Sequence, residues 1–474
     1  MIAVLLALGA HAEMPQESRP LSWNEHAGRN RHPGQNGKLS ATESKMAEAA
    51  WQYFENNFEK DTCLYNSVDK YPSTTMWDTA SAIGAMVAAF ELGLIDPPTF
   101  DQRMSCLIDS LNQMELFRGE LPNKAYQTQT LAQVDYNNKP GELGFSAIDV
   151  GRLLTWLAIV KNRYPVHGDK IDRTVLRWNF CNVVDRGGIL KGAIIGEDGA
   201  LQYVQEGRLG YEEYAALGFQ LWGFDTTAAS QVDPHEEIEL FGVPIAYDPR
   251  DPVQFGAHTY ITTEPYLLMG VEMNWDLADD ETYSDDWQSD RDARTMAKRV
   301  YKAQVRRFRR TGIMTARTEH HVEGAPYFVY DALYSDGKEW PTISDTGEVY
   351  PDLAAVSSRA AVGLDMLFGT RYTGWLTDSI QPLVDPQRGI YEGYTEVGTQ
   401  PIAALTANTN GIILESLLYK VQGKLYRDDG FETLWERVPN WEFSGKGQCL
   451  PGSRHEQELV TDRRGHYEEG TSSP

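Results

Sequence analysis

The chain has 474 residues and a formal net charge of −25, with 68 acidic against 43 basic side chains. This charge argues against binding nucleic acid or an anionic membrane through net charge, and no stretch approaches the roughly 18 apolar residues of a membrane span. Aromatic residues are plentiful, with 12 Trp and 24 Tyr. Flat rings in a cleft suit the apolar faces of sugars, although most such rings belong to protein cores.

The first predicted segment is a signal peptide over residues 1–12. Residues 2–9 are apolar, and Ala-His-Ala at 10–12 matches the small-residue site at which signal peptides are cleaved, although the positively charged n-region is missing. We therefore expect the mature protein to be periplasmic or secreted. Residues 13–38 are polar and rich in Pro, Gly, Asn and Arg, which predicts a flexible lead-in.

Residues 39–439 follow a helical pattern and are predicted to form one catalytic barrel. Helices that are apolar nearly all round alternate with amphipathic ones, which distinguishes helices buried in a core from helices that coat it. The amphipathic segments, with heavily charged faces, are 41–58, 97–114, 168–180 and 285–311. The apolar segments are 79–93, 150–160, 214–224, 265–273, 354–369 and 411–419.

Six buried helices with amphipathic partners predict an all-α fold, an (α/α)6 barrel of twelve principal helices in two concentric rings. Small β-containing loops are expected around 188–196 and 326–334. The alternative is an open helical solenoid, but no fixed repeat of about 30–45 residues is visible. Residues 440–474 are predicted to be a polar tail with little to bury.

Each predicted buried helix begins with a polar or acidic motif. Inner helices of a two-ring barrel run parallel, so these motifs should meet at one end and line a cavity. The motifs are WDTAS (77–81), FSAID (145–149), EGRLGYEEY (206–214), TTEP (262–265), ISDTGEVYPD (343–352), YEGYTE (391–396) and TANTNG (406–411).

The third motif is the hardest to explain as a helix start alone. Glu206, Glu212 and Glu213 lie close together in the sequence, immediately before an apolar run. One carboxylate is enough to cap a helix, whereas crowded and desolvated carboxyl groups acquire the raised pKa that a general acid needs at neutral pH. By contrast, Asp149 and Glu264 also fit ordinary helix starts, and so does Asp78.

No pattern in the sequence indicates a metal or cofactor, and none is expected. His235 and the pair His320–His321 lack partners at metal-ligand spacing, and neither a phosphate-binding loop nor a serine-hydrolase motif occurs. The four cysteines are too far apart for a zinc site. Their pairing, or their persistence as buried thiols, stays open.

Several stretches resemble a bacterial domain-of-unknown-function family over residues 40–425. More distantly, they are similar to the glycoamylase-like group, whose endo-β-1,2-glucanases and glucan-trimming domains are (α/α)6 barrels that act on β-1,2-glucans. The matching stretches are TMWDTAS, GFSAIDVGRLLTWL, EGRLGYEEYAALGFQLWGFD, TTEPYLLMGVE and ALTANTNGIILESLLYK.

The resemblance also implies site residues. A Ser-Thr-Ile-Asp-Thr helix start in that group resembles Ser146–Asp149, and a Gly-Tyr-Asn-Glu-Tyr segment resembles Gly210–Tyr214, which places the group's acidic residue on Glu213. The middle Asn is Glu212 here.

We therefore expect a glycoside hydrolase, most specifically an endo-β-1,2-glucanase, whose partner is a glucan polysaccharide or oligosaccharide. Hydrolysis needs a protonated carboxyl group on the leaving oxygen and a second carboxylate. Glu213 is the predicted acid, with Glu206 in reserve, and Asp149 is the predicted base, followed by Asp345. The predicted substrate contacts are Trp77, Asp78, Arg152, Tyr211, Glu212, Glu264, Asp345, Tyr391, Glu392, Tyr394, Asn408 and Asn410.

Two other functions remain open at this point. A polysaccharide lyase would need Tyr or His as base and positive charge near a uronate, which the acidic motifs do not favour. A non-catalytic barrel that binds glycans or assists their export would need no positioned carboxyl group at all.

Overall fold

The structure is a computed structural model that describes residues 37–196, 198–207, 209–231, 235–251, 259–275, 288–427 and 449–451. These residues all belong to one compact unit, His32–Pro474. The predicted signal peptide, nearly all of the predicted lead-in and the predicted tail apart from 449–451 lie outside the described residues.

Helices dominate the fold, and the described part of the chain contains eleven α-helices. They are α1 (Ala41–Asn56), α2 (Met76–Glu91), α3 (Pro97–Gln113), α4 (Ala147–Arg163), α5 (Gly168–Val175), α6 (Tyr211–Leu221), α8 (Glu264–Met273), α9 (Gln288–Thr311), α10 (Ser358–Phe368), α11 (Arg371–Ser379) and α12 (Ala407–Gln422). Three short 3-10 helices are Pro165–His167, Pro351–Leu353 and Gln381–Leu383.

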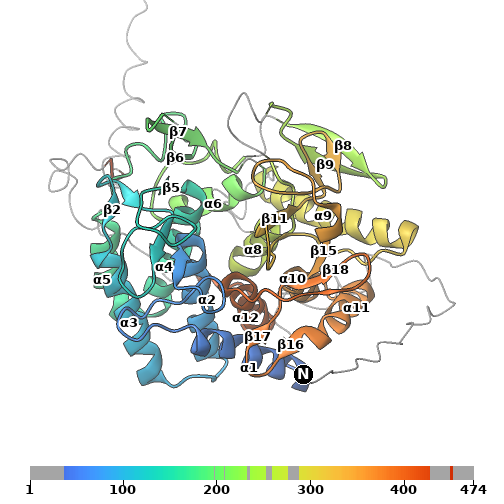
Figure 1. The fold of residues 1–474 in the computed structure, drawn as a ribbon, viewed down its shortest axis with the longest axis horizontal. Helices are drawn as coiled ribbons and strands as arrows, with labels where there is room; N and C mark the ends of the chain where they lie inside the picture. Colours follow the sequence, from blue (N-terminus) through green and yellow to red (C-terminus); the bar gives the residue numbers. More distant parts are fainter. Residues whose placement is uncertain are drawn as a thin grey trace, which may run out of the picture. The chain divides into compact units, whose positions relative to one another are not determined.

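Six of the helices close a ring of contacts. Helix α2 packs on α4, α4 on α6, α6 on α8, α8 on α10, α10 on α12, and α12 returns to α2 (Figure 1). These are the helices predicted to be buried, and nearly every side chain of α2 and α12 is buried. Helix α1 packs against α12, α3 against α2, α5 against α4, α9 against α8 and α11 against α10. The six segments predicted to be buried form the ring, and the four predicted amphipathic segments pack on it, whereas α11 was not predicted from sequence.

Two glycines allow α4 and α6 to approach closely. A Cβ atom added to Gly218 would lie 1.9 Å from the carbonyl oxygen of Gly151, and one added to Gly151 would lie 2.6 Å from the Cβ of Ala215. Any larger residue would push the helices apart. The relative position of the first turns of α4 and α6 therefore depends on this contact.

Strands are more numerous than the sequence analysis predicted, and they form small antiparallel sheets in the connections. The two expected β regions are present as β6 and β11, but many further connections also pair, because short extended segments satisfy their backbone groups by pairing with each other. The sheets are β1–β4, β2–β3, β5–β6–β7, β8–β9, β10–β11–β14, β12–β13, β15–β18–β19 and β16–β17.

The strands have the following bounds. They are β1 (Ser73–Thr75), β2 (Leu116–Phe117), β3 (Leu121–Pro122), β4 (Ala125–Gln127), β5 (Gly144–Phe145), β6 (Lys191–Ile195), β7 (Leu201–Gln205), β8 (Glu236–Leu240), β9 (Val243–Tyr247), β10 (Glu319–His321), β11 (Phe328–Asp331), β12 (Tyr334–Ser335), β13 (Lys338–Glu339), β14 (Thr342–Ile343), β15 (Ala355–Ser357), β16 (Val384–Asp385), β17 (Gly389–Ile390), β18 (Gly393–Thr395) and β19 (Pro401–Ile402).

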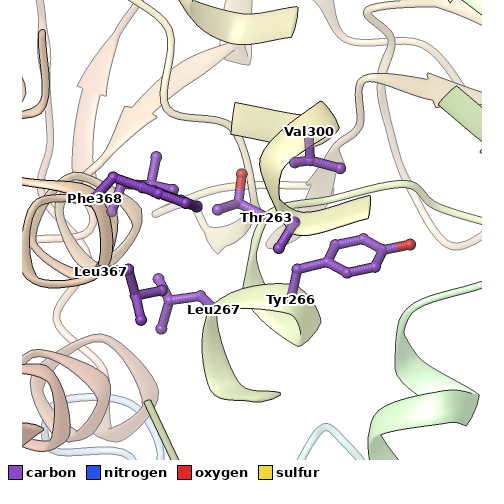
Figure 2. Close-up of a pocket in the computed structure, with 8 residues that line it drawn as sticks. Thr263, Tyr266, Leu267, Val300, Leu367 and Phe368 are labelled. Carbon is purple, nitrogen blue, oxygen red and sulfur yellow. The ribbon is translucent and has the colours of Figure 1, made fainter. Parts of the chain in front are cut away.

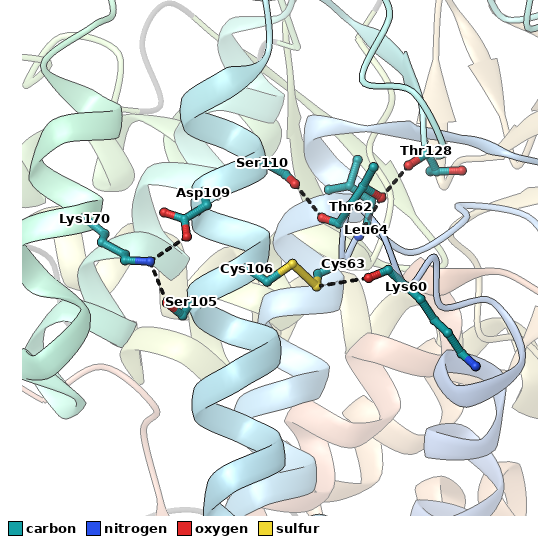
Figure 3. The surroundings of a disulfide bond; sticks show 10 residues. All are labelled: Lys60, Thr62, Cys63, Leu64, Ser105, Cys106, Asp109, Ser110, Thr128 and Lys170. Atoms are coloured by element: carbon teal, nitrogen blue, oxygen red, sulfur yellow. Dashed lines mark hydrogen bonds and ion pairs between the residues drawn. A yellow bond between two sulfur atoms is a disulfide. The ribbon is translucent and has the colours of Figure 1, made fainter.

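All four cysteines form disulfides. Cys63 pairs with Cys106, which ties the segment after α1 to α3 (Figure 3), and Cys181 pairs with Cys449. The sequence analysis could not choose between these bridges and buried thiols, because sequence spacing carries no information on which cysteines meet in the fold.

A small apolar pocket lies between α8, α9 and α10 (Figure 2). Its lining residues are Thr263, Tyr266, Leu267, Ala297, Val300, Leu364, Leu367 and Phe368. The Thr263 hydroxyl already accepts a hydrogen bond from Gln304 Nε2 at 3.0 Å. We regard the pocket as a packing gap between helices, because it contains no charged side chain and no cluster of polar groups.

Candidate active site

Helix caps position the first acidic side chains of the site. The hydroxyl of Thr75 accepts a hydrogen bond from the backbone N–H of Asp78 at 3.0 Å, and the hydroxyl of Ser146 accepts one from Asp149 at 3.2 Å. Each bond satisfies an otherwise unpaired donor and fixes the first turn of α2 or α4. The two carboxylates therefore lie at the same level of neighbouring helices in the ring.

The first turns of the ring helices meet, as predicted. Trp77 Nε1 donates to Glu264 Oε1 at 3.2 Å and to Asn408 Oδ1 at 3.1 Å, and Asn408 Nδ2 donates to Glu264 Oε1 at 2.7 Å. The Trp77 ring also lies 6.0 Å from the Tyr211 ring. We call the following residues, which together come from all six ring helices, the helix-start cluster: Trp77, Asp78, Asp149, Tyr211, Glu264, Arg359 and Asn408.

Asp149 has the electrostatic properties expected of a proton donor. Burial and the nearby Glu206 carboxylate raise its pKa to about 7, with a smaller contribution from Asp78, against the opposing effects of Lys124 and Ser146. Its side chain is nevertheless partly exposed. A carboxyl group that is desolvated yet partly exposed, with a pKa near neutrality, is a candidate for proton transfer.

Glu206 stands beside Asp149 at the start of α4. Its Oε2 accepts a hydrogen bond from the backbone N–H of Ala147 at 2.8 Å, and its Oε1 lies 3.4 Å from Lys124 Nζ. Residue 192 must be glycine for this arrangement, because a Cβ there would lie 2.2 Å from the Glu206 carboxylate. The loop from β6 to α6 thus brings a second carboxylate to Asp149.

The three glutamates of 206–213 do not cluster, which corrects the prediction. Glu212 is fully buried and accepts hydrogen bonds from Leu190 N at 3.2 Å and Gln205 Nε2 at 2.7 Å. Glu213 accepts a bond from the backbone N–H of Gly210 at the start of its own helix. A loop and a helix turn direct the three side chains to different hydrogen-bond partners.

A buried charged layer lies beneath the helix-start cluster. Arg152 packs its guanidinium 4.7 Å from the centre of the Trp77 ring and donates to Glu415 Oε1 at 3.1 Å, with both side chains fully buried. Glu272 accepts bonds from Trp156 Nε1 at 3.0 Å and Tyr214 Oη at 2.7 Å. The hydrogen bond to Glu415 therefore holds the Arg152 guanidinium against the Trp77 ring.

Strand β10 crosses the helix-start cluster and carries residues that the sequence analysis passed over. Glu319 accepts hydrogen bonds from Tyr211 Oη and from Thr318 Oγ1, and burial and Glu264 raise its pKa to about 7. Burial lowers the pKa of His321, on which the Glu392 and Asp78 carboxylates act in the opposite direction. The segment TEHH (318–321) consists of four polar residues and shows no apolar alternation, so the sequence did not predict a strand there.

Arg359 is the second residue that the sequence analysis missed. Its guanidinium pairs with Glu264 and, at 2.9 Å, with Glu392, and it lies 3.9 Å from Glu319. Arg359 and Arg152 lower the pKa of Glu264 against the effect of burial, whereas burial and the Glu264 charge raise the pKa of Glu319 to about 7 against the effect of Arg359. Nothing in the sequence identified an arginine inside an apolar helix as part of a site.

Three tyrosines and Asp345 approach the cluster from the connecting segments. Tyr260 and Tyr330 stack with ring centres 3.7 Å apart, and the charges of Asp149, Glu206 and Asp345 act on the hydroxyl of Tyr136. Asp345 is exposed and also acts on Tyr330. The structure therefore brings the predicted residue Asp345 to the same region as Asp149.

Six predicted contact residues have their side chains engaged elsewhere, which differs from the prediction: Arg152 and Glu212 are fully buried with the partners given above, and the other four follow. Asn410 bonds the backbone of Ile390 and Thr406, and Glu392 bonds Thr406, Thr409 and Arg359. The Tyr394 hydroxyl donates to Ser379, and the Tyr391 hydroxyl accepts from Arg388. Asn410 and Glu392 thus stabilise the start of α12. Tyr394 bonds the end of α11, and Tyr391 bonds the preceding loop.

No metal centre is visible in the described residues, where no three His, Cys, Asp or Glu side chains group as ligands would. Likewise, none of the helices within those ranges has the length and apolar character needed to cross a membrane.

Solved structures of endo-β-1,2-glucanases and of a candidate glucoamylase are similar to the protein in fold. The endo-β-1,2-glucanase of Chitinophaga pinensis matches with a TM-score of 0.59 at 11% identity, covering 82% of this chain and 94% of that chain. The endo-β-1,2-glucanase of Talaromyces funiculosus in complex with sophorose matches with a TM-score of 0.53 at 13% identity, covering 81% and 84%. A candidate glucoamylase from Bacteroides caccae gives 0.59 at 13% identity, covering 81% and 94%.

The chain itself belongs to the family described as "Protein of unknown function (DUF3131)", whose profile matches residues 45–423. No curated protein matches it in sequence. The likeness to the glucanases at 11–13% identity therefore concerns the fold.

Proposed function

We propose that the protein is a glycoside hydrolase that cleaves β-1,2-glucan within the chain. The observation that carries the proposal is Asp149, a partly exposed carboxyl group with a pKa of about 7 where six helix starts and several aromatic rings meet. The fold shared with endo-β-1,2-glucanases supports the substrate class. The closed ring of six helices supports the (α/α)6 barrel, with the β8–β9 hairpin occupying part of the connection between α6 and α8.

In the proposed reaction, protonated Asp149 donates its proton to the oxygen of the bond that breaks. Asp345, which is exposed and acts with Asp149 on the same tyrosine, is the proposed second carboxylate, activating water or attacking the sugar. Burial and the negative charge of Glu206 raise the pKa of Asp149 to about 7, so that its proton is available near neutral pH. The sequence analysis predicted Asp149 as the base and Glu213 as the acid. Here Asp149 is the acid, in place of Glu213.

The experiment is a panel of linear and cyclic β-1,2-, β-1,3-, β-1,4- and mixed-linkage glucans, with new reducing ends measured. We expect hydrolysis of β-1,2-glucan, and a fall in turnover of about 10²–10⁴-fold in Asp149→Asn, the usual contribution of a positioned acid. Asp378→Asn, an exposed change on the covering helix α11, serves as the matched control.

Other outcomes of the panel would reject the proposal. Products that absorb in the ultraviolet would identify a lyase. Binding of glucan without any new reducing ends would identify a non-catalytic barrel. Hydrolysis of another linkage alone would retain the hydrolase and reject the β-1,2 specificity.

We also propose that the protein is exported to the periplasm or secreted. The two disulfides support this, because such bonds persist in oxidising compartments and are rare in the cytosol. Fractionation of the native host, with the intact mass of the recovered protein, tests the location and the predicted removal of residues 1–12. Recovery of the protein from the cytosolic fraction with its cysteines reduced would contradict the proposed export.

A further inference from the structure

The first turn of α4 has two caps, and only one of them belongs to the helix itself. The Ser146 hydroxyl accepts a hydrogen bond from the N–H of Asp149 at 3.2 Å, whereas the N–H of Ala147 donates to Glu206 Oε2 at 2.8 Å. A helix start leaves its first N–H groups without partners, and the helix dipole favours a carboxylate there. Glu206 and Asp149 therefore share one helix turn, whose pitch is about 5.4 Å.

The loop that carries Glu206 fits closely against this turn. A Cβ atom at Gly207 would lie 3.2 Å from the Ile148 side chain, so the loop backbone lies directly against the residue that precedes Asp149. A Cβ at Gly192 on β6 would lie 2.2 Å from the Glu206 carboxylate, so the glycine leaves room for it. The loop thus contacts two successive residues of α4 immediately before the candidate acid.

Lys124 holds the other oxygen of Glu206. Its Nζ lies 3.4 Å from Glu206 Oε1, and each of the two side chains is 16% exposed. The backbone N–H of Lys124 donates to the carbonyl oxygen of Gly144 at 2.8 Å, and Gly144 belongs to β5, two residues before the cap Ser146. Lys124 is therefore fixed to the same segment of chain that begins α4.

The charges that act on Asp149 come from three elements. Burial has the largest effect on its pKa and raises it. Glu206 from the β7–α6 loop and Asp78 from α2 also raise it, whereas Lys124, next to β4, lowers it. Asp149 in turn acts on the phenol of Tyr136, which is uncharged at neutral pH. The charge beside Asp149 therefore depends on whether the ion pair of Lys124 and Glu206 is intact.

We propose that Lys124 and Glu206 are a positioning pair that fixes the Asp149 carboxyl group at the start of α4 and sets the pH range over which it keeps its proton. Glu206 acts through its bond to Ala147 and through its negative charge. Lys124 holds Glu206 and offsets part of that charge. The pair rests on the proposed function for its effect on catalysis, but its effect on Asp149 is present without substrate.

The ionisation of Asp149 can be measured in two ways. The first is the alkaline limb of kcat on β-1,2-glucan. The second needs no substrate: it is the pH dependence of the difference in unfolding free energy between each protein and the same protein carrying Asp149→Asn. Lys124→Met should move both to higher pH by about 0.5–1.5 units, because a nearby positive charge is removed, and Lys124→Arg should restore the parent values. Glu206→Gln should move both to lower pH by a similar amount.

Two substitutions of Glu206 separate position from charge. The amide oxygen of Gln can still accept the bond from Ala147, whereas Ala removes both the bond and the charge. In Glu206→Ala we expect kcat at the optimum pH to fall by about tenfold or more, with KM changed less, because a small displacement of a reacting group slows the reaction. Glu206→Gln should retain more of kcat than Glu206→Ala.

Lys191→Met is the matched control. Lys191 Nζ lies at the same distance, 3.4 Å, from the Asp185 carboxylate, and it precedes Gly192 on β6. Since successive side chains of a strand point to opposite faces, Lys191 points away from the face on which Glu206 lies. Lys191→Met should leave both pH values as in the parent.

Two results would overturn the positioning pair. One is equal behaviour of Lys124→Met and Lys191→Met in both measurements. The other is a loss of kcat in Glu206→Gln as large as in Glu206→Ala, which would make Glu206 itself a reacting group. A parent that cleaves no glucan would reject the proposed function, and the unfolding measurement would still decide on the pair. A shift in the unfolding measurement without a shift in the kcat limb would support the pair and remove Asp149 as the acid.

Discussion

At the scale of single residues, the useful distinction is between a carboxyl group that serves its own helix and one that faces an opening. Asp149 and Glu213 both occupy the third position of a ring helix. Asp149 is partly exposed with its pKa near neutrality, whereas Glu213 is 5% exposed and bonds its own helix start. Both acidic residues could be found from sequence, but the direction of each side chain depends on neighbours that are distant along the chain.

The raised pKa of Asp149 predicts how stability depends on pH. Its pKa rises from an unfolded value near 3.8 to about 7 in the folded protein, so the folded state holds the proton more tightly. The contribution to stability is complete below about pH 4 and is lost as the pH rises through about 7. Asp149→Asn, which cannot ionise, should therefore raise the free energy of unfolding at pH 8 by about 1–3 kcal/mol and change it little at pH 4.

Denaturant unfolding of both proteins at the two pH values measures this difference. Asp378→Asn should show no such dependence on pH. An equal effect of Asp149→Asn at pH 4 and pH 8 would mean that Asp149 is ionised in the folded protein throughout, and it would remove the basis for assigning it the proton.

Glu213→Gln separates the two assignments of the acid. The amide oxygen of Gln can still accept the bond from Gly210, so the free energy of unfolding should fall by less than about 1 kcal/mol. Turnover and the alkaline limb of the rate profile should be preserved, because that limb reports the ionisation of the acid. Loss of turnover by about 10²-fold or more, with the fold intact, would restore Glu213 as the donor.

At the scale of elements, helices were predictable and connections were not. Residues 79–93 and 411–419 were recognised as buried because their apolar character covers the whole helix surface. Strands of two to five residues carry no comparable period. The region of β11 was expected from sequence, but the position of Glu319 on β10 emerged only from the fold. The ring helices thus carry the helix-start cluster, and the unpredicted strand β10 adds Glu319 and His321 to the site.

The glycine contact between α4 and α6 can be tested as an element-level constraint. In Gly218→Ala the new Cβ would meet the Gly151 backbone, so we expect a loss of about 1–3 kcal/mol in the free energy of unfolding, together with lower kcat as Asp149 shifts. Gly374→Ala on α11 meets nothing within 4 Å and should stabilise the protein slightly. Equal stability of the two variants in thermal unfolding would show that α4 and α6 can separate freely.

At the scale of the whole molecule, the order of the helices could be predicted from the sequence, but the closure of the six buried helices into a ring could not. Alternation of buried and covering helices along the chain is visible in sequence, and so is the polar start of each buried helix. The return of α12 to α2 and the disulfide between Cys181 and Cys449 join segments hundreds of residues apart. Local sequence patterns do not show which distant segments come into contact in the fold.

The link between Cys181 and Cys449 has a consequence for the integrity of the molecule. These residues are 268 positions apart, so more than half of the polypeptide forms a covalent loop. A protease that cuts once inside this loop opens it without releasing a fragment. Nicked protein should therefore migrate as one band on a non-reducing gel and as two after reduction, and separation without reductant would show that the link is not formed. A protein built in this way can be cut once by a protease and still remain a single particle.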